Sequence, residues 1–121
     1  MAKILVVDDE HLMVRMVQIR LEASGYEVIT AYDGEEGLEK AKRENPDLIM
    51  LDIMMPKMDG HEVCRFLKAD EWYKHIPIII LSAKTQKSDI DKSLKAGAEA
   101  HITKPFEPKV LLAKIEEVLN R

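Results

Sequence analysis

Hydrophobic residues along the chain gather in short continuous runs that are separated by segments of helical periodicity. The run that follows Asp47 shows no alternation of polar and apolar residues and is bounded by Pro46 and Asp52, which is typical of a strand covered on both faces. Three other segments share this character, although the last of them is shorter. We expect buried strands at Lys3–Val7, Asp47–Leu51, Ile76–Leu81 and Ala100–Thr103.

A fifth strand is expected at Glu27–Ala31, which is more polar and alternates as a strand at the edge of a sheet does. Helical patterns connect the strands, and they predict helices over His11–Ser24, Gly34–Asn45, a segment with Asp59 as its N-cap, Gln86–Ala96 and Pro108–Asn120. Strands that alternate with helices favour a parallel sheet. The sequence therefore predicts an α/β, flavodoxin-like three-layer sandwich with a five-stranded parallel sheet of order 2-1-3-4-5 and five helices.

The periodicity also predicts which helical side chains face the core. The expected residues are Leu12, Met13, Met16, Val17 and Leu21 in the first helix, Val63, Phe66 and Leu67 in the third, and Leu111, Ile115, Val118 and Leu119 in the last. The fourth helix offers only Ile90 and Leu94 as large apolar residues, so we expect it to be held loosely. Trp72 and Tyr73 are expected to cover the start of the strand that follows them.

Polar side chains stand where the predicted strands end. Asp8 and Asp9 follow the first strand, Asp52 the third, Ser82 the fourth and Lys104 the fifth. Because parallel strands direct their carboxyl ends to the same edge of a sheet, we expect these five side chains to converge there. Open α/β sheets bind their ligands at this edge.

Three carboxylates in one small site repel one another unless a cation lies between them. Lys104 supplies one positive charge, and a divalent ion would neutralise the remainder. Oxygen ligands of this kind favour Mg²⁺, which keeps several waters and is commonly completed by a phosphate oxygen. A carboxylate beside bound Mg²⁺, with a lysine and a hydroxyl group facing it, is equipped to accept a phosphoryl group.

Each of these residues also has a simpler interpretation. Taken alone, Asp8 and Asp9 can cap the first helix, Ser82 can be a turn residue, and Lys104 can be a solvated surface lysine. Their joint placement with Asp52 at strand ends favours a shared site instead. The histidines show no metal-ligand spacing, and we interpret three of them, His11, His61 and His75, as surface or cap residues.

Length and composition exclude several classes of protein. The 121 residues are enough for one domain with a proper core and too few for two. Acidic residues (22) outnumber basic ones (18) and no basic stripe is present, so we expect no direct contact with nucleic acid. No apolar run approaches the roughly 20 residues of a membrane span and no signal pattern precedes the first strand, so a cytoplasmic location is expected. Cys64 is the only cysteine, and we expect it to be buried.

Four motifs in this order resemble the receiver domain of two-component response regulators, the CheY-like family. They are Asp8-Asp9, the run DIMMPKMDG from Asp52 to Gly60, Ser82-Ala83, and Lys104-Pro105-Phe106. The resemblance covers the whole chain. It implies that Asp52 is the phosphoacceptor and that Lys104 and Ser82 supply the lysine and the hydroxyl group of the family. It also implies a Mg²⁺ ion held by Asp8, Asp9, Asp52 and the backbone carbonyl of Met54, and a cis peptide bond between Lys104 and Pro105.

One position departs in part from the family pattern. The residue three before the lysine is most often Tyr or Phe in receivers, whereas here it is His101. With Ser82, this residue would form the switch that responds to phosphorylation. The resemblance also places Met54 and Lys84 beside the path of the water that hydrolyses the aspartyl-phosphate. Because Met54 offers no polar group and Lys84 can screen the phosphate, we expect a long-lived phosphoryl group.

Three other functions fit the sequence less well. A Mg²⁺-dependent phosphatase of the haloacid-dehalogenase type carries a second acid two residues after its nucleophile, where this chain has Met54. A flavin- or dinucleotide-binding module lacks its G-x-G-x-x-G motif here. An unphosphorylated, purely protein-binding receiver is disfavoured by the intact acids, Ser82 and Lys104.

The predicted function is therefore a phosphoacceptor signalling switch rather than an enzyme, although it would assist its own phosphorylation and dephosphorylation. We expect residues 1–121 to form a single receiver domain with no output domain, phosphorylated by a sensor histidine kinase or a phosphotransfer protein. The output would be a partner protein bound on the face of the fourth helix, the Ala100–Thr103 strand and the last helix. A monomer or a weak, phosphorylation-dependent dimer is expected, with no membrane contact.

Overall fold

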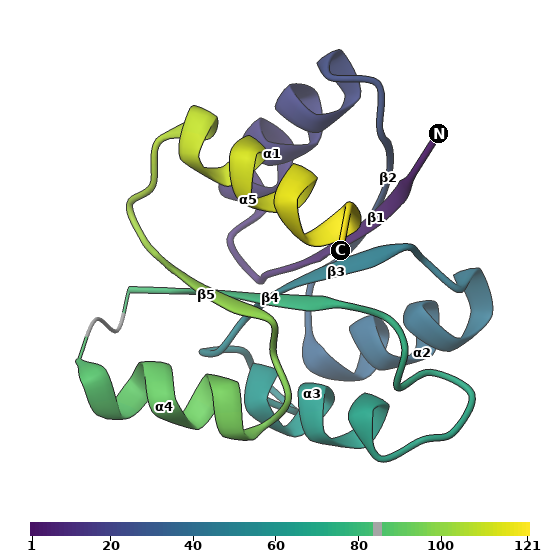
Figure 1. Cartoon of the computed structure of the whole chain (residues 1–121), viewed down its shortest axis with the longest axis vertical. Coiled ribbons are helices and arrows are strands. Elements are labelled where there is room, and N and C mark those ends of the chain that lie inside the picture. Colours follow the sequence, from purple (N-terminus) through teal and green to yellow (C-terminus); the bar gives the residue numbers. More distant parts are fainter. Residues whose placement is uncertain (84–85) are drawn as a thin grey trace.

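A five-stranded parallel sheet runs through the middle of the molecule, with helices on both of its faces (Figure 1). The computed structural model describes residues 1–83 and 86–121. In chain order the elements are β1 (Lys3–Val7), α1 (His11–Ala23), β2 (Glu27–Ala31), α2 (Gly34–Glu44), β3 (Leu48–Asp52), α3 (Gly60–Lys68), β4 (Ile78–Ser82), α4 (Lys87–Lys95), β5 (Ala100–Thr103) and α5 (Pro108–Leu119). The strands pair in the order β2-β1-β3-β4-β5, and every pair is parallel. The predicted fold class and strand order are confirmed.

The strands begin and end within two residues of the predicted positions, and the largest shift is at the start of β4. This strand begins at Ile78 rather than Ile76. Pro77 lies between them and has no amide hydrogen to donate to a neighbouring strand, although its carbonyl accepts a hydrogen bond from the Ile49 amide at 3.0 Å. At their C-terminal ends β3 and β4 each run one residue further than predicted, because Asp52 and Ser82 are the last residues of these strands rather than the first residues after them.

Two hydrophobic clusters lie on opposite faces of the sheet. Helices α1 and α5 cover one face, and α2, α3 and α4 cover the other (Figure 1). Consecutive residues of β3 alternate between the clusters: Leu48 and Met50 belong to the one under α1 and α5, and Ile49 and Leu51 to the other. All four side chains are fully buried. Burial on both faces is the reason why the runs in the sequence show no alternation.

The orientation predicted for α1 is wrong in part. Its buried residues are Val14, Val17 and Leu21, whereas Leu12 and Met16 are 83% and 66% exposed. Apolar residues occur on most sides of this helix, so their spacing alone does not determine which stripe meets the sheet. The helix thus leaves a row of hydrophobic side chains in solvent.

Three other apolar residues predicted to be buried are exposed: Phe66 (56%), Trp72 (80%) and Leu94 (49%). Trp72 does not cover the start of β4, although its neighbour Tyr73 packs against the core beneath α3. On α4 the buried side chain is the polar Ser93. Of the two large apolar residues that the sequence indicated for this helix, Leu94 is exposed and Ile90 is half-buried, so neither is fully buried against the rest of the protein.

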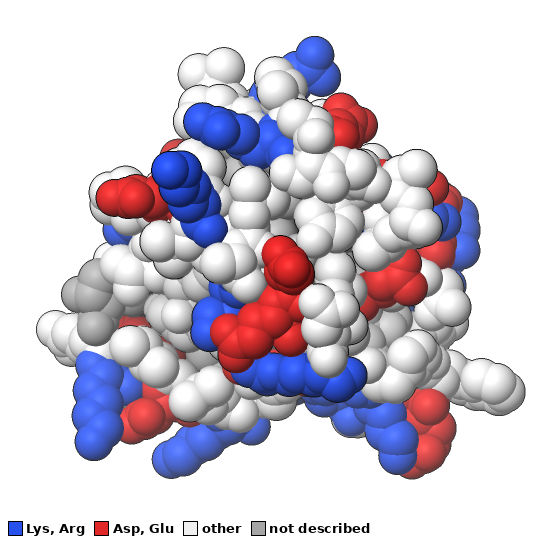
Figure 2. All heavy atoms as spheres, turned by 45° about the horizontal axis from the view of Figure 1, so that its top comes forward, with Lys and Arg blue, Asp and Glu red and all other residues white. Residues whose placement is uncertain are grey.

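Charged side chains of both signs are interspersed over the surface, and Figure 2 shows no continuous basic stripe on the face in view. The cysteine at position 64 is buried, as predicted, and its thiol donates a hydrogen bond to the Ala96 carbonyl at 3.3 Å. None of the helices in the described part of the chain is both long and apolar enough to cross a membrane.

Candidate functional site

The parallel sheet brings the polar ends of four strands together, as the sequence analysis predicted. Asp52 ends β3 and Ser82 ends β4. Asp8 follows β1 directly, and its neighbour Val7 pairs with Leu51 in β3. Asp8 and Ser82 are fully buried, and Asp52 is only 5% exposed. The site is therefore set into the edge of the sheet rather than displayed on a loop.

The three predicted acids form one cluster. Asp8, Asp9 and Asp52 each offer a carboxylate oxygen, and these oxygens all lie within 4.8 Å of one another. Asp9 is exposed, whereas the other two are buried. The cluster thus opens to solvent on the side of Asp9, where a ligand can enter.

Lys104 reaches into this cluster from the loop after β5. Its ammonium group lies 2.6 Å from Oδ2 of Asp8, 3.5 Å from Oδ1 of Asp52 and 3.1 Å from Oε1 of Glu10. The peptide bond between Lys104 and Pro105 is cis, as predicted. Glu10 is a partner of Lys104 that the sequence did not indicate, because an acid at the start of a helix is adequately explained by its interaction with the helix dipole.

Burial and crowding of like charges dominate the electrostatics. Burial raises the pKa of Asp52 to about 6, and the charges of Asp8 and Asp9 add to this effect against the attraction of Lys104. Burial also raises the pKa of Asp8. Burial alone would lower the pKa of Lys104, but the hydrogen bond to Asp8 and the charges of Asp52 and Asp8 outweigh it and raise that pKa. A cation placed among the three carboxylates would reduce the repulsion between their negative charges.

The amino-acid sequence matches the family described as "Response regulator receiver domain" over residues 4–116. The chain belongs to this family. Receiver domains of two-component response regulators are phosphoacceptor signalling domains, which confirms the predicted class of function.

Curated relatives match this chain over part of their longer sequences. The alkaline phosphatase synthesis transcriptional regulatory protein PhoP of Bacillus subtilis is 50% identical over 119 residues, which cover 98% of this chain and 49% of PhoP. The response regulator PleD of Caulobacter vibrioides is 44% identical over 117 residues, covering 97% of this chain and 26% of PleD. The chain thus spans half or less of the length of these relatives.

Solved structures agree with the fold. The chemotaxis protein CheY4 of Vibrio cholerae has a TM-score of 0.92 at 38% sequence identity, and the match covers 98% of each chain. The receiver domain of the Francisella response regulator 1452 has a TM-score of 0.94 at 30% identity and covers 100% of this chain and 98% of that one.

In this receiver, the loop after β3 shapes the open side of the cluster. Asp59 caps α3, because its side chain accepts a hydrogen bond from the Glu62 amide at 3.0 Å. The Asp59 amide in turn donates a hydrogen bond to the Glu62 side chain at 3.4 Å. Gly60 lies so close to the Asp52 carbonyl that a Cβ atom would clash with it. Met54 is 61% exposed beside the acids. Lys84, predicted with Met54 to govern the phosphoryl lifetime, lies outside the described residues.

A hollow of about 470 Å³ leads from the acid cluster toward α4, and Asp9, Met54, His61 and Lys92 are among its lining residues. His61, one of these lining residues, lies with its Nε2 atom 3.0 Å from the hydroxyl group of Ser93 on α4, and that hydroxyl group lies 2.8 Å from Nδ1 of His101. His61 is half-buried and contacts Ser93, so the interpretation of it as a surface or cap residue is wrong in part. Nothing in the spacing along α3 indicates this contact, because it depends on how α3 and α4 pack against each other.

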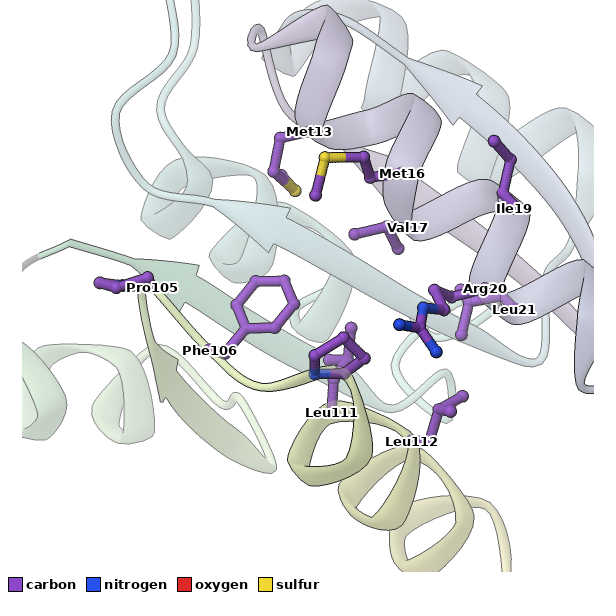
Figure 3. A pocket seen from close by; sticks show the side chains of 11 residues that line it. Met13, Met16, Val17, Ile19, Arg20, Leu21, Pro105, Phe106, Leu111 and Leu112 are labelled. Atoms are coloured by element: carbon purple, nitrogen blue, oxygen red, sulfur yellow. The ribbon is translucent and has the colours of Figure 1, made fainter.

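A second hollow, also of about 470 Å³, lies between α1 and α5 (Figure 3). Its lining is apolar apart from Arg20 and includes Met13, Met16, Phe106 and Leu112. It contains no carboxylate or hydroxyl group that could take part in phosphoryl transfer.

Proposed function

We propose that this receiver accepts a phosphoryl group on Asp52 from a histidine kinase or a phosphotransfer protein, in a reaction that requires Mg²⁺. The observation that carries the proposal is the position of the Asp52 carboxylate, which is buried at the end of β3 with Lys104 at 3.5 Å and two further acids around it. Asp8 is also buried beside Lys104 and two acids, but its Oδ2 is already paired with the Lys104 ammonium group at 2.6 Å and its Oδ1 accepts a hydrogen bond from the Glu10 amide, whereas Lys104 lies farther from Asp52.

Asp8, Asp9, Asp52 and the backbone carbonyl of Met54 would hold the ion, since hard oxygen ligands of this kind suit Mg²⁺. When bound, Mg²⁺ neutralises charge on the transferring phosphoryl oxygens. A carboxylate oxygen of Asp52 forms the new bond to phosphorus while the bond from phosphorus to the donor's histidine nitrogen breaks. The nitrogen keeps the electron pair of that bond and takes a proton from solvent.

Lys104 and Ser82 are the groups that stabilise the product. Lys104 already lies between Asp8 and Asp52, so its ammonium group can reach an oxygen of a phosphoryl group on Asp52. Ser82 ends β4, beside β3, and its hydroxyl group can donate a hydrogen bond to another of these oxygens. We assign Ser82 and His101 to the switch that carries the signal toward α4 and β5.

The protein assists its own phosphorylation and dephosphorylation but is not a phosphatase for other substrates. A phosphatase of the haloacid-dehalogenase type needs an acid near its nucleophilic carboxylate to protonate the leaving group. The exposed thioether of Met54 occupies that position and has no proton to give. Hydrolysis of the aspartyl-phosphate therefore resets a switch, and the long phosphoryl lifetime expected from Met54 and Lys84 stays a prediction.

The output surface proposed for this receiver is the face of α4, β5 and α5. The contact between Ser93 on α4 and His101 on β5 supports it, because this contact joins two of the three elements.

Several relatives are named transcriptional regulators, and this chain covers about half of their length. Acidic and basic side chains are mixed on the face in Figure 2, so that face offers no basic stripe of the kind that binds nucleic acid. Cytoplasmic location and a monomer or weak dimer stay predictions.

The experiment is incubation of the purified protein with a small phosphodonor and Mg²⁺, followed by intact-mass measurement. We expect a gain of one phosphoryl group that requires Mg²⁺ and is absent in Asp52→Asn. Asp91→Asn, an exposed acid on α4, is the matched control and should be phosphorylated like the wild type. Phosphorylation of Asp52→Asn, or phosphorylation that persists with a chelator, would contradict the proposal.

A further inference from the structure

The Ser93 hydroxyl group contacts residues of α3, of β5 and of its own helix, α4. It lies 3.0 Å from Nε2 of His61 on α3, 2.8 Å from Nδ1 of His101 on β5 and 3.3 Å from the carbonyl oxygen of Asp89, one turn earlier in α4. Ser93 is fully buried, and it is the only buried residue of α4 itself. The helix is therefore fastened to its neighbours at a polar point.

The hydrogen-bond capacity of a hydroxyl group determines the direction of these contacts. A serine hydroxyl has one proton to donate and two lone pairs to accept with. It donates to the Asp89 carbonyl, which cannot donate in return. Both imidazole nitrogens must then donate to Ser93, so the neutral histidines carry their protons on Nε2 of His61 and on Nδ1 of His101. All three contacts are satisfied at once only in this arrangement.

We propose that His61, Ser93 and His101 form a proton-sensitive lock that holds α4 against α3 and β5 and opens when His61 is protonated or α4 moves. A movement of α4 away from either neighbour has to break one of the two imidazole contacts. The part of the proposal that concerns phosphorylation rests on the proposed function, because α4 belongs to the face assigned to the output.

The surroundings of His61 make its charged form unfavourable in the locked arrangement. Burial lowers the pKa of His61, the charges of Arg65, His101 and Lys92 lower it further, and only Asp59 opposes them. Asp89, whose carbonyl accepts from Ser93, lines the same hollow as His61. Arg65, Lys92 and Lys95 line a hollow together with His61, so a charged imidazole in the locked arrangement lies among other cations. An open arrangement, with the ring in water, relieves each of these costs.

The direction of the pH dependence follows from proton linkage. The locked form holds the pKa of His61 below its ordinary value of about 6.5, so protons bind preferentially to the open form. The lock is therefore fully closed above about pH 6.5 and is progressively lost as the pH falls below that value. A receiver with this device moves α4 more readily in acid than at pH 7.5.

Hydrogen exchange of the α4 segment tests the lock in the unphosphorylated protein, by mass spectrometry at pH 7.5 and 5.5 with correction for the intrinsic exchange rate. At pH 7.5 we expect Ser93→Ala to speed α4 exchange about five- to thirtyfold, while Ser88→Ala, an exposed serine of the same helix, leaves it unchanged. In the wild type, α4 should lose protection at pH 5.5. His61→Gln keeps a neutral donor near the position of Nε2, so this variant should stay protected at both pH values.

The segment of α1 is the internal control, because a variant that unfolds globally speeds exchange there as well. The lock is overturned if Ser93→Ala protects α4 as the wild type does, or if His61→Gln loses α4 protection at pH 5.5 to the same extent as the wild type. These readouts require no phosphoryl group. If Ser93→Ala opens α4 but Asp52 is never phosphorylated, the lock stands and the proposed function fails.

Discussion

The ammonium group of Lys104 lies 2.6 Å from Oδ2 of Asp8, inside the carboxylate cluster. Its distance to Asp52 is longer, at 3.5 Å. Before phosphorylation Lys104 therefore neutralises mainly Asp8, which is an expected ligand of Mg²⁺. The ion and the lysine compete for the charge of this acid, and a phosphoryl group on Asp52 gives the lysine a new partner.

Replacing Lys104 with Met should separate these two roles. Loss of the competing charge should strengthen Mg²⁺ binding about fivefold, because the cluster becomes more negative. Loss of the ammonium group near the transferring oxygens should slow phosphorylation about 100-fold. Calorimetric titration with Mg²⁺ and the rate of mass gain with a phosphodonor measure the two effects. An unchanged phosphorylation rate would show that Lys104 only pairs with Asp8, and exposed Lys95→Met serves as the control.

Asp52 should lower the stability of the metal-free protein at neutral pH. Its pKa is about 6 in the folded protein and 3.8 as the unperturbed value, so the unfolded chain releases this proton more readily. The contribution of protonated Asp52 to the free energy of unfolding is fully present below pH 3.8. It is lost as the pH rises through 6, by about 3 kcal/mol at most. Asp52→Asn should therefore raise the midpoint of urea unfolding at pH 7.5 without metal, and much less at pH 4.5. Equal effects at both pH values would exclude this origin.

The convergence of Asp8, Asp52, Ser82 and Lys104 could be predicted because parallel strands carry their ends to one edge, whatever the details of packing. The orientation of helices was less predictable. Leu12 and Leu94 fit an apolar stripe as well as the residues that are actually buried, and only the contact with the sheet decides between stripes.

Side chains that act across two elements were missed for a related reason. Ser93 looks like an ordinary polar residue of a helix, and His61 has no partner at helical spacing within α3. Their contact exists because α3 and α4 lie next to each other on the same face of the sheet (Figure 1). Packing of this kind follows from the tertiary structure and leaves no periodic signal in the sequence.

Met54 should govern how long the phosphoryl group persists. Its side chain is exposed beside the acids and offers no polar group to orient the attacking water. Met54→Glu and Met54→Asn supply such a group and should speed dephosphorylation about threefold or more. Loss of the aspartyl-phosphate after removal of the donor can be followed by intact mass. Met16→Asn, an exposed methionine of α1, is the matched control; rates at or below the wild-type value in both Met54 variants would contradict the prediction.

His101 should be needed for the response to phosphorylation but not for the chemistry. His101→Ala removes the donor to Ser93 while leaving the acid cluster and Lys104 intact. We expect Asp52 to be phosphorylated as in the wild type, while the phosphorylation-dependent changes in the amide resonances of α4 and α5, and hence partner binding on that face, become weaker. Resonance changes of wild-type size in this variant would place the switch elsewhere.

The identity of the phosphorylated residue tests the central claim most directly. Borohydride reduces an aspartyl-phosphate to homoserine, so reduction after phosphorylation, followed by proteolysis and peptide sequencing by mass spectrometry, marks the acceptor. The account predicts homoserine at position 52 alone, formed only when Mg²⁺ and the phosphodonor are both present. Homoserine at position 8 or 9, or at 52 without Mg²⁺, would contradict it.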